Sequence, residues 1–193
     1  MIRACAFDLG NTLSDDTTLY DRALGQFAKW LVERGAIGDA AQFITVFDLL
    51  IRYIKDGRVK LDKTRFTEPA TYHDPCNYGR RAQKLFGHGF FDEPRWILDQ
   101  CMDDWVELYP NRMNQICCGG GGGALTSGYN EERIFYGRRK MEQIRATGAQ
   151  TIVVPCHSCH GQLNNIKESY GMSDLKVTYL WELVADCMIV QQK

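Results

Sequence analysis

The placement of cysteine constrains this chain more than any other feature of its sequence. Eight cysteines occur in 193 residues, and five of them form a series of one single residue, one adjacent pair and one Cys-x-x-Cys motif: Cys76, Cys117, Cys118, Cys156 and Cys159. The first residues show no secretory pattern, so we expect a reducing, cytoplasmic compartment, where thiols are buried structural groups, metal ligands or redox groups. Cys5, Cys101 and Cys187 lie singly within apolar patterns, and we expect them to pack as small hydrophobic side chains.

Strand and helix patterns alternate over most of the chain. Short apolar segments predict strands at 70–73, 151–154 and 176–180, with a further strand running from 111–115 into the cysteine pair. Helical spacing predicts amphipathic helices between and around these strands, at 92–108, 131–147, 158–170 and 181–190, and an earlier one that Asp39 could cap. This alternation predicts an α/β fold of the Rossmann-like kind, a mostly parallel sheet with flanking helices.

The predicted topology brings the cysteines of the series together. Cys76, the Cys117-Cys118 pair and Cys156 each follow a predicted strand end, and Cys159 lies one turn into the following helix. In parallel sheets, ligand sites gather beyond the carboxyl ends of the strands. The sequence therefore predicts one five-thiolate site at one edge of the sheet.

Five thiolates need a cation to hold them together, and soft thiolates select zinc, copper(I) or iron–sulfur clusters. Zinc and ordinary cubane clusters each take four ligands, so the fifth cysteine is surplus, although an adjacent pair could chelate or bridge an opened cluster. The glycine run 119–123 would let bare backbone approach the sulfurs, with Gly119 and Gly120 donating N–H groups to them. His73 titrates in a range that suits a proton donor, whereas His157 and His160 are expected outside the ligand set.

Charge and hydropathy exclude other classes of function. The formal net charge of −1 gives no global field for capturing nucleic acid, so no nucleic-acid partner is expected. The longest apolar stretches, 43–51 and 183–190, each contain an aspartate and are shorter than the roughly 20 residues that a spanning helix needs.

Three motifs resemble those of a known family: Tyr72-His73-Asp74-Pro75-Cys76, Cys117-Cys118-Gly119 and Pro155-Cys156-His157-Ser158-Cys159. They are similar to one cysteine-rich CCG domain of the heterodisulfide reductase B subunit. Segments 89–95, 109–112 and 142–149 resemble the DsrK-type branch, and the resemblance extends over about 41–193. It implies that the five cysteines bind a noncubane [4Fe–4S] cluster at which a disulfide is reduced, although some relatives hold zinc at a similar motif.

The resemblance also implies partners. These are other electron-transfer subunits, a membrane subunit that would attach the complex to the inner membrane face, and a substrate that is a small sulfur-carrier protein or a thiol disulfide. The sequence contains no Cys-x-x-Cys-x-x-Cys run of the kind that holds ferredoxin-like cubane clusters in DsrK-like proteins. We therefore expect electrons to be supplied by another chain.

The N-terminal segment, 1–40, resembles something different. Phe7-Asp8-Leu9-Gly10-Asn11-Thr12-Leu13 is similar to the opening motif of haloacid-dehalogenase-type phosphatases, in which Asp8 would be the nucleophile. The second aspartate of that motif is Gly10 here, and Asp103-Asp104, the remaining acidic candidates, lie within a predicted helix. We therefore predict an incomplete segment over 1–40 and an iron–sulfur domain over 41–193.

Three functions follow from these patterns. The leading hypothesis is an iron–sulfur oxidoreductase module that passes electrons to a disulfide-like substrate, either a heterodisulfide or a protein disulfide or trisulfide. One alternative is a zinc-binding structural or assembly module. The other is a phosphatase that uses Asp8.

Overall fold

The computed structural model describes residues 45–190, apart from residue 122 and the side chain of residue 85. The predictions for Asp8, Cys5, the Asp39 cap and the whole segment 1–40 lie outside these residues. Among the described residues, no helix is long and apolar enough to cross a membrane.

A four-stranded sheet forms the centre of the fold. Its strands lie in the order β2-β1-β3-β4, and each neighbouring pair is parallel. Tyr72 on β1 stands opposite Glu107 on β2 and Val153 on β3. The bounds are β1 Ala70–Tyr72, β2 Trp105–Glu107, β3 Thr151–Val154 and β4 Lys176–Tyr179. The predicted α/β class with a parallel sheet is confirmed.

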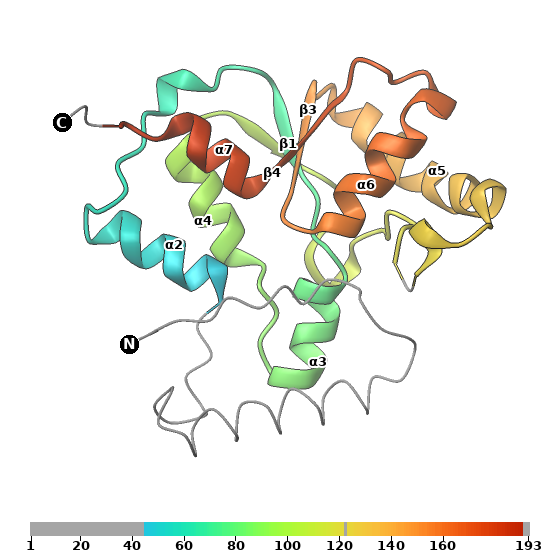
Figure 1. Ribbon diagram of the computed structural model, residues 1–193, viewed down its shortest axis with the longest axis horizontal. Helices are drawn as coiled ribbons and strands as arrows, with labels where there is room; N and C mark the ends of the chain where they lie inside the picture. Colours follow the sequence, from blue (N-terminus) through green and yellow to red (C-terminus); the bar gives the residue numbers. More distant parts are fainter. Residues whose placement is uncertain (1–44, 122, 191–193) are drawn as a thin grey trace.

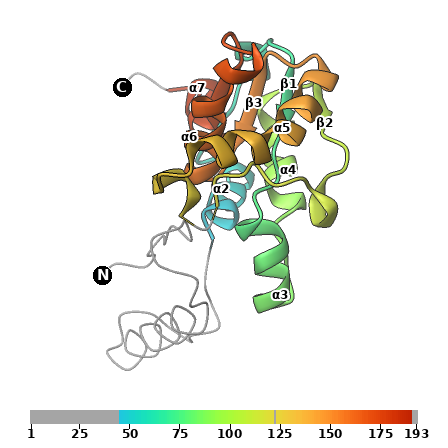
Figure 2. The same cartoon turned by 90° about the vertical axis from the view of Figure 1, so that its right-hand side faces the viewer.

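Helices cover both faces of this sheet. Figure 1 shows α2, α4 and α7 on one side and α5 and α6 on the other, and Figure 2 shows α3 projecting beyond the edge of the sheet. Their bounds are α2 Val46–Lys55, α3 Ala82–Phe86, α4 Asp92–Cys101, α5 Asn130–Thr147, α6 His157–Ile166 and α7 Leu180–Cys187. The chain leaves β1 toward β2 in one direction and then crosses back to β3, so the strand order reverses between β1 and β3.

Local sequence explains where these elements begin and end. Thr45 caps α2 in a reciprocal capping box with Asp48, and Gly148 ends α5 in the left-handed conformation that glycine adopts at little cost. Strand β3 is buried at all four positions, as expected for a central parallel strand covered on both faces.

Cys101 and Cys187 lie in the core between α4 and α7. Both are fully buried, and Cys187 Sγ lies 3.4 Å from the Cys101 carbonyl oxygen. Burial raises the pKa of both thiols, so both stay protonated and pack as the sequence predicts.

Two element predictions were wrong. The predicted helix over 92–108 ends at Cys101, because Met102 is extended and Trp105–Glu107 pairs with β1 as strand β2. The hydrogen bond from Thr71 Oγ1 to the Val106 carbonyl, 2.6 Å long, adds to this pairing. No strand leads into Cys117: a 3₁₀ turn, Arg112–Asn114, is followed by a loop that carries the cysteine pair. Consequently Asp103 and Asp104 lie exposed between α4 and β2 rather than within a helix.

Candidate metal centre

The two central strands deliver the outer motifs of the cysteine series to one edge. Strand β1 ends at Tyr72, just before His73 and Cys76, and β3 ends at Val154, just before Cys156. Because β1 and β3 are parallel neighbours, both motifs leave the sheet at the same edge. This is also the point where the strand order reverses, which is where open α/β sheets form their ligand crevice.

The side chains of the five cysteines form one continuous series of contacts. Cys76 contacts Cys117, Cys117 contacts Cys118, and Cys159 contacts both Cys118 and Cys156. The Cys118 and Cys159 sulfurs lie 3.4 Å apart. Within this set Cys117 is exposed, Cys76 is half-buried, and the other three are buried. The structure therefore brings together all five residues that the sequence predicts as ligands.

Electrostatics within the series favour a single thiolate at Cys117. Hydrogen bonds from the thiols of Cys118 and Cys76 hold the pKa of Cys117 far below its ordinary value, and the Gly119 N–H donates to its sulfur at 3.3 Å. Donation to Cys117 conversely raises the pKa of Cys76 and of Cys118. A site that is to hold more than one thiolate thus needs a cation among the sulfurs.

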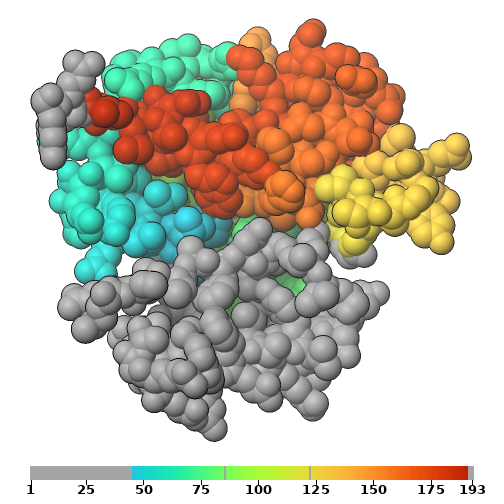
Figure 3. Space-filling model, in the orientation of Figure 1, coloured from blue at the N-terminus to red at the C-terminus, as the bar shows by residue number. Residues whose placement is uncertain are grey.

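The glycine run lies against helix α6 and presents its backbone to the sulfurs. Besides the Gly119 donation, the Gly120 N–H hydrogen-bonds Cys118. A Cβ atom on Gly120 would lie 2.6 Å from Gln162 Cβ and 3.0 Å from the Ser158 carbonyl oxygen. Glycine at this position therefore permits a close approach that any other side chain would prevent. Residues of this run and of the turn after it, yellow in Figure 3, stand at the surface beside α6.

Gln162 and Arg133 hold the Cys118 loop in place. Gln162 is fully buried and donates from Nε2 to the Cys118 carbonyl oxygen at 3.1 Å. Its Oε1 accepts from Arg133 Nη1 at 2.5 Å, and Arg133 Nη2 also donates to Asn165 Oδ1. These contacts connect α5, α6 and the cysteine pair in one buried network.

His73 lies inside the site, closer to the sulfurs than the sequence indicated. It is 1 % exposed, and neither ring nitrogen has a hydrogen-bond partner among the described residues. A ring nitrogen lies with the Cys118 and Cys159 sulfurs in a group whose atoms are all within 4.8 Å of one another. Burial, with Lys140 nearby, holds the pKa of His73 well below its ordinary value, so the imidazole is neutral.

The other two histidines face elsewhere. His160 stacks on the Tyr179 ring with centroids 4.0 Å apart, and His157 Nδ1 lies 2.6 Å from the Tyr179 hydroxyl.

Two basic residues beside the site were not singled out from the sequence. Arg80 donates to the Gln115 carbonyl oxygen at 2.7 Å and so connects the turn after Cys76 to the loop that carries Cys117. Lys140 is fully buried on α5, and burial lowers its pKa to about 8, although the nearby Cys118 sulfur and Asp74 carboxylate oppose that shift. Its place between Gly137 and Met141 on the inward face of α5 is the signal that could have identified it.

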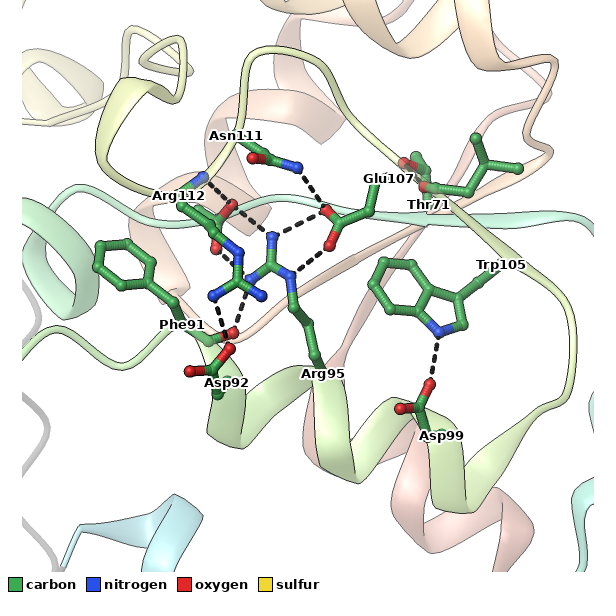
Figure 4. Close-up of polar contacts among 11 residues, drawn as sticks. Thr71, Phe91, Asp92, Arg95, Asp99, Trp105, Glu107, Asn111 and Arg112 are labelled. Carbon is green, nitrogen blue, oxygen red and sulfur yellow. Dashed lines mark hydrogen bonds and ion pairs between the residues drawn. The ribbon is translucent and has the colours of Figure 1, made fainter.

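A buried ionic network supports the segment that carries Cys76. Arg95 on α4 donates to both carboxylate oxygens of Asp74 and to both of Glu107 on β2. The Arg112 N–H donates to Asp74 Oδ2 at 2.8 Å, and Asn111 Nδ2 donates to Glu107 Oε2 at 3.0 Å. Figure 4 shows these groups converging between α4 and β2. The network fixes Asp74, two residues before Cys76.

A pocket of about 550 Å³ opens beside the exposed sulfur of the series. Gln115 in its wall is buried, and both polar atoms of its side chain lack partners among the described residues. Arg139 and the ring of Tyr136 stand exposed at its rim. The lining residues are Pro110, Asn114, Gln115, Ile116, Cys117, Gly119, Gly121, Tyr136 and Arg139.

The donor set of this site fits a soft metal centre. Five sulfurs and one neutral imidazole converge, and two of the sulfurs receive backbone N–H groups. Thiolate donors suit zinc or iron–sulfur clusters, and N–H donation to sulfur is one of the ways in which proteins tune cluster potential. Four-coordinate zinc would leave at least one of the five sulfurs without a metal bond.

Comparison with known proteins agrees with this site. Residues 70–164 match the family described as the cysteine-rich domain, CCG. The chain is 32% identical over 133 residues to a probable membrane-anchored ferredoxin of Chromohalobacter salexigens, covering 68% of this chain and 18% of that protein. It is 29% identical over 135 residues to a dihydromethanophenazine:CoB–CoM heterodisulfide reductase chain, the D subunit of the Methanosarcina barkeri enzyme, covering 67% and 31%.

A third relative is the Hdr-like menaquinol oxidoreductase iron-sulfur subunit 2 of Archaeoglobus fulgidus, 26% identical over 155 residues, which are 77% of this chain and 27% of that protein. In all three cases the match spans less than a third of the relative's length. The resemblance to the CCG domain of the heterodisulfide reductase family is confirmed.

Proposed function

Because the chain carries a cysteine-rich CCG domain, we propose that it is an iron–sulfur oxidoreductase module that passes electrons to a disulfide-like substrate. The observation that carries the proposal is the continuous series of five cysteine side chains at the reversal point of the sheet. The residues that would hold a noncubane [4Fe–4S] cluster are Cys76, Cys117, Cys118, Cys156 and Cys159.

When bound, the cluster would supply one electron at a time at low potential. The chain's own residues hold and tune it. The Gly119 and Gly120 N–H groups direct positive dipole ends at the sulfurs of the cysteine pair, which stabilises added negative charge. The N-terminus of α6 begins at Cys156 and adds the positive end of its helix dipole beside Cys159.

Substrate would reach the site through the pocket beside Cys117. The unpartnered amide of Gln115 and the cationic Arg139 suit a sulfur compound with a polar or anionic end. Reduction of a disulfide consumes two electrons and two protons and releases two thiols. The role of His73 as proton donor stays a prediction: with its pKa lowered, the ring would take up a proton only after negative charge beside it had increased.

Partners follow from this electron count. Two electrons must arrive singly, and the described residues form one cysteine cluster, so other electron-transfer subunits would supply them. A membrane subunit on the inner membrane face, and a small sulfur-carrier protein or thiol disulfide as electron acceptor, complete the proposed assembly. Two of the relatives are by name subunits of oxidoreductases.

Anaerobic reconstitution tests the proposal. The full chain, supplied with iron and sulfide, should bind about four irons in one cluster with visible absorption. Cys117→Ser and Cys118→Ser should each disrupt that cluster, whereas Cys101→Ser, which changes a thiol in the core between α4 and α7, should not. Full iron content and an unchanged spectrum in both site variants would show that the five cysteines do not act as one site.

A zinc-binding structural module is the second candidate, and the short distances among His73, Cys118 and Cys159 favour it. Zinc bound there would be four-coordinate and colourless. The two functions separate by metal analysis after anaerobic purification. One zinc per chain that is lost in His73→Ala, with no iron uptake on reconstitution, would support the structural module.

A further inference from the structure

Lys140 places a buried cation beside the cysteine series. Its side chain has no solvent exposure, and its ammonium donates to Gln143 Oε1 at 2.5 Å. Gln143 in turn donates from Nε2 to the Pro110 carbonyl oxygen at 2.7 Å, which fixes the amide that holds the ammonium. Within the described part of the chain, Lys140 forms no ion pair with a carboxylate.

A buried cation without a paired carboxylate is costly, since removing an ion from water costs several kcal/mol even after the protein relaxes. The negative groups that act on the Lys140 ammonium are the sulfurs of Cys118, Cys159 and Cys117, together with the Asp74 carboxylate. Arg95 already pairs with Asp74 through two hydrogen bonds. The remaining counter-charge for Lys140 is therefore the sulfur set, and the burial of the lysine makes sense when that set carries negative charge.

We propose that Lys140 is a positioning residue that fixes a positive charge behind the five sulfurs and thereby raises the reduction potential of the cluster they hold. This inference rests on the proposed iron–sulfur function. Reduction adds one negative charge to the site, and a fixed cation in a poorly solvated environment stabilises the reduced form more than the oxidised one. Gln143 holds the ammonium in place through its bond to Pro110.

The test compares Lys140→Met, which removes charge and hydrogen bond, with Lys140→Gln, which removes the charge but keeps a side-chain donor. Lys84→Met makes the same chemical change at an exposed position on α3 and serves as the control. The readouts are iron content and the midpoint potential of the reconstituted full chain, followed by electron paramagnetic resonance. We expect both Lys140 variants to lose at least tenfold in the equilibrium constant for one-electron reduction, a shift of about 59 mV to more negative potential. Lys84→Met should match the unsubstituted protein.

Lys140→Arg keeps the charge and should restore most of the potential, which a purely packing role would not explain. An assembled cluster whose potential is unchanged in Lys140→Gln would overturn the inference, as would a Lys140→Arg protein with the same shift as Lys140→Met. Failure of the unsubstituted chain to bind iron would instead overturn the proposed function. The two failures are therefore distinguishable.

Discussion

The guanidinium of Arg95 donates to both carboxylate oxygens of Asp74, from Nη1 to Oδ1 at 2.7 Å and from Nη2 to Oδ2 at 2.9 Å. Both side chains are almost completely buried, and Asp74 lies two residues before Cys76. One hydrogen-bonded pair between α4 and the end of β1 thus anchors the segment that supplies the first sulfur of the site.

Arg95→Met should lower the free energy of unfolding by about 3–5 kcal/mol, because it leaves the Asp74 carboxylate buried without its partner. Urea unfolding of the metal-free full chain measures this loss. Lys63→Met breaks the exposed ion pair with Asp103 and should cost about 0–1 kcal/mol. Equal effects of the two substitutions would show that the Arg95 pair has no special structural weight.

Gly120→Ala should destabilise the protein by about 1–3 kcal/mol, because the added methyl group would collide with Gln162 and Ser158 on α6. Gly121→Ala is the matched control, since a Cβ atom there meets no atom within 4 Å. Thermal unfolding of both variants checks the expectation. Equal melting temperatures would contradict the close approach of the glycine run to α6.

Cys117 should be the fastest of the five cysteines to react with iodoacetamide in metal-free protein. It is exposed, and the lowered pKa keeps its sulfur a thiolate when the pH falls. An ordinary thiol with a pKa of about 8.5 loses about tenfold in rate per pH unit below that value. Between pH 8 and pH 6 the Cys117 rate should therefore change far less than that of glutathione.

Peptide mass spectrometry after short alkylation times gives the site-specific rates. A Cys117 rate that falls in parallel with the glutathione rate would show that the hydrogen bonds from Cys76 and Cys118 do not stabilise its thiolate.

Arg80→Met should loosen the loop that carries Cys117, because it removes the 2.7 Å hydrogen bond to the Gln115 carbonyl oxygen. Amide hydrogen exchange over residues 113–118 should become faster, while exchange in β3 stays unchanged. Arg52→Met, on the exposed face of α2, is the control. Unchanged exchange in the loop would mean that other contacts hold it.

Much of the site could be predicted because it depends on local pattern and strand order. The strand 151–154 stands out as a short β-branched run, and Gly148 marks the end of the preceding helix. Once the sheet is parallel, Cys76 and Cys156 must leave it at the same edge, since both follow strand ends. The convergence of the cysteines thus follows from topology and needs no side-chain detail.

The segment 92–108 shows where the sequence pattern was insufficient. Ile97, Cys101 and Trp105 repeat at helical spacing, yet the helix ends at Cys101 and Trp105 begins β2. Pairing with β1, over a separation of 35 residues, outweighs local periodicity here. Cys117 and Cys118 consequently reach the site through a loop held by Arg80 and Gln162 rather than at the end of a strand.

By itself, the sequence determined the parallel α/β fold and the convergence of the five cysteines, because both follow from residue order and short-range preference. Only the tertiary structure decided the charge environment of the sulfurs. His73 has no hydrogen-bond partner among the described residues, Lys140 has no solvent contact, and Arg95 joins Asp74 to Glu107 across separate elements. Burial and long-range pairing set the energies of these groups, and neither is encoded in the identity of one residue or its near neighbours.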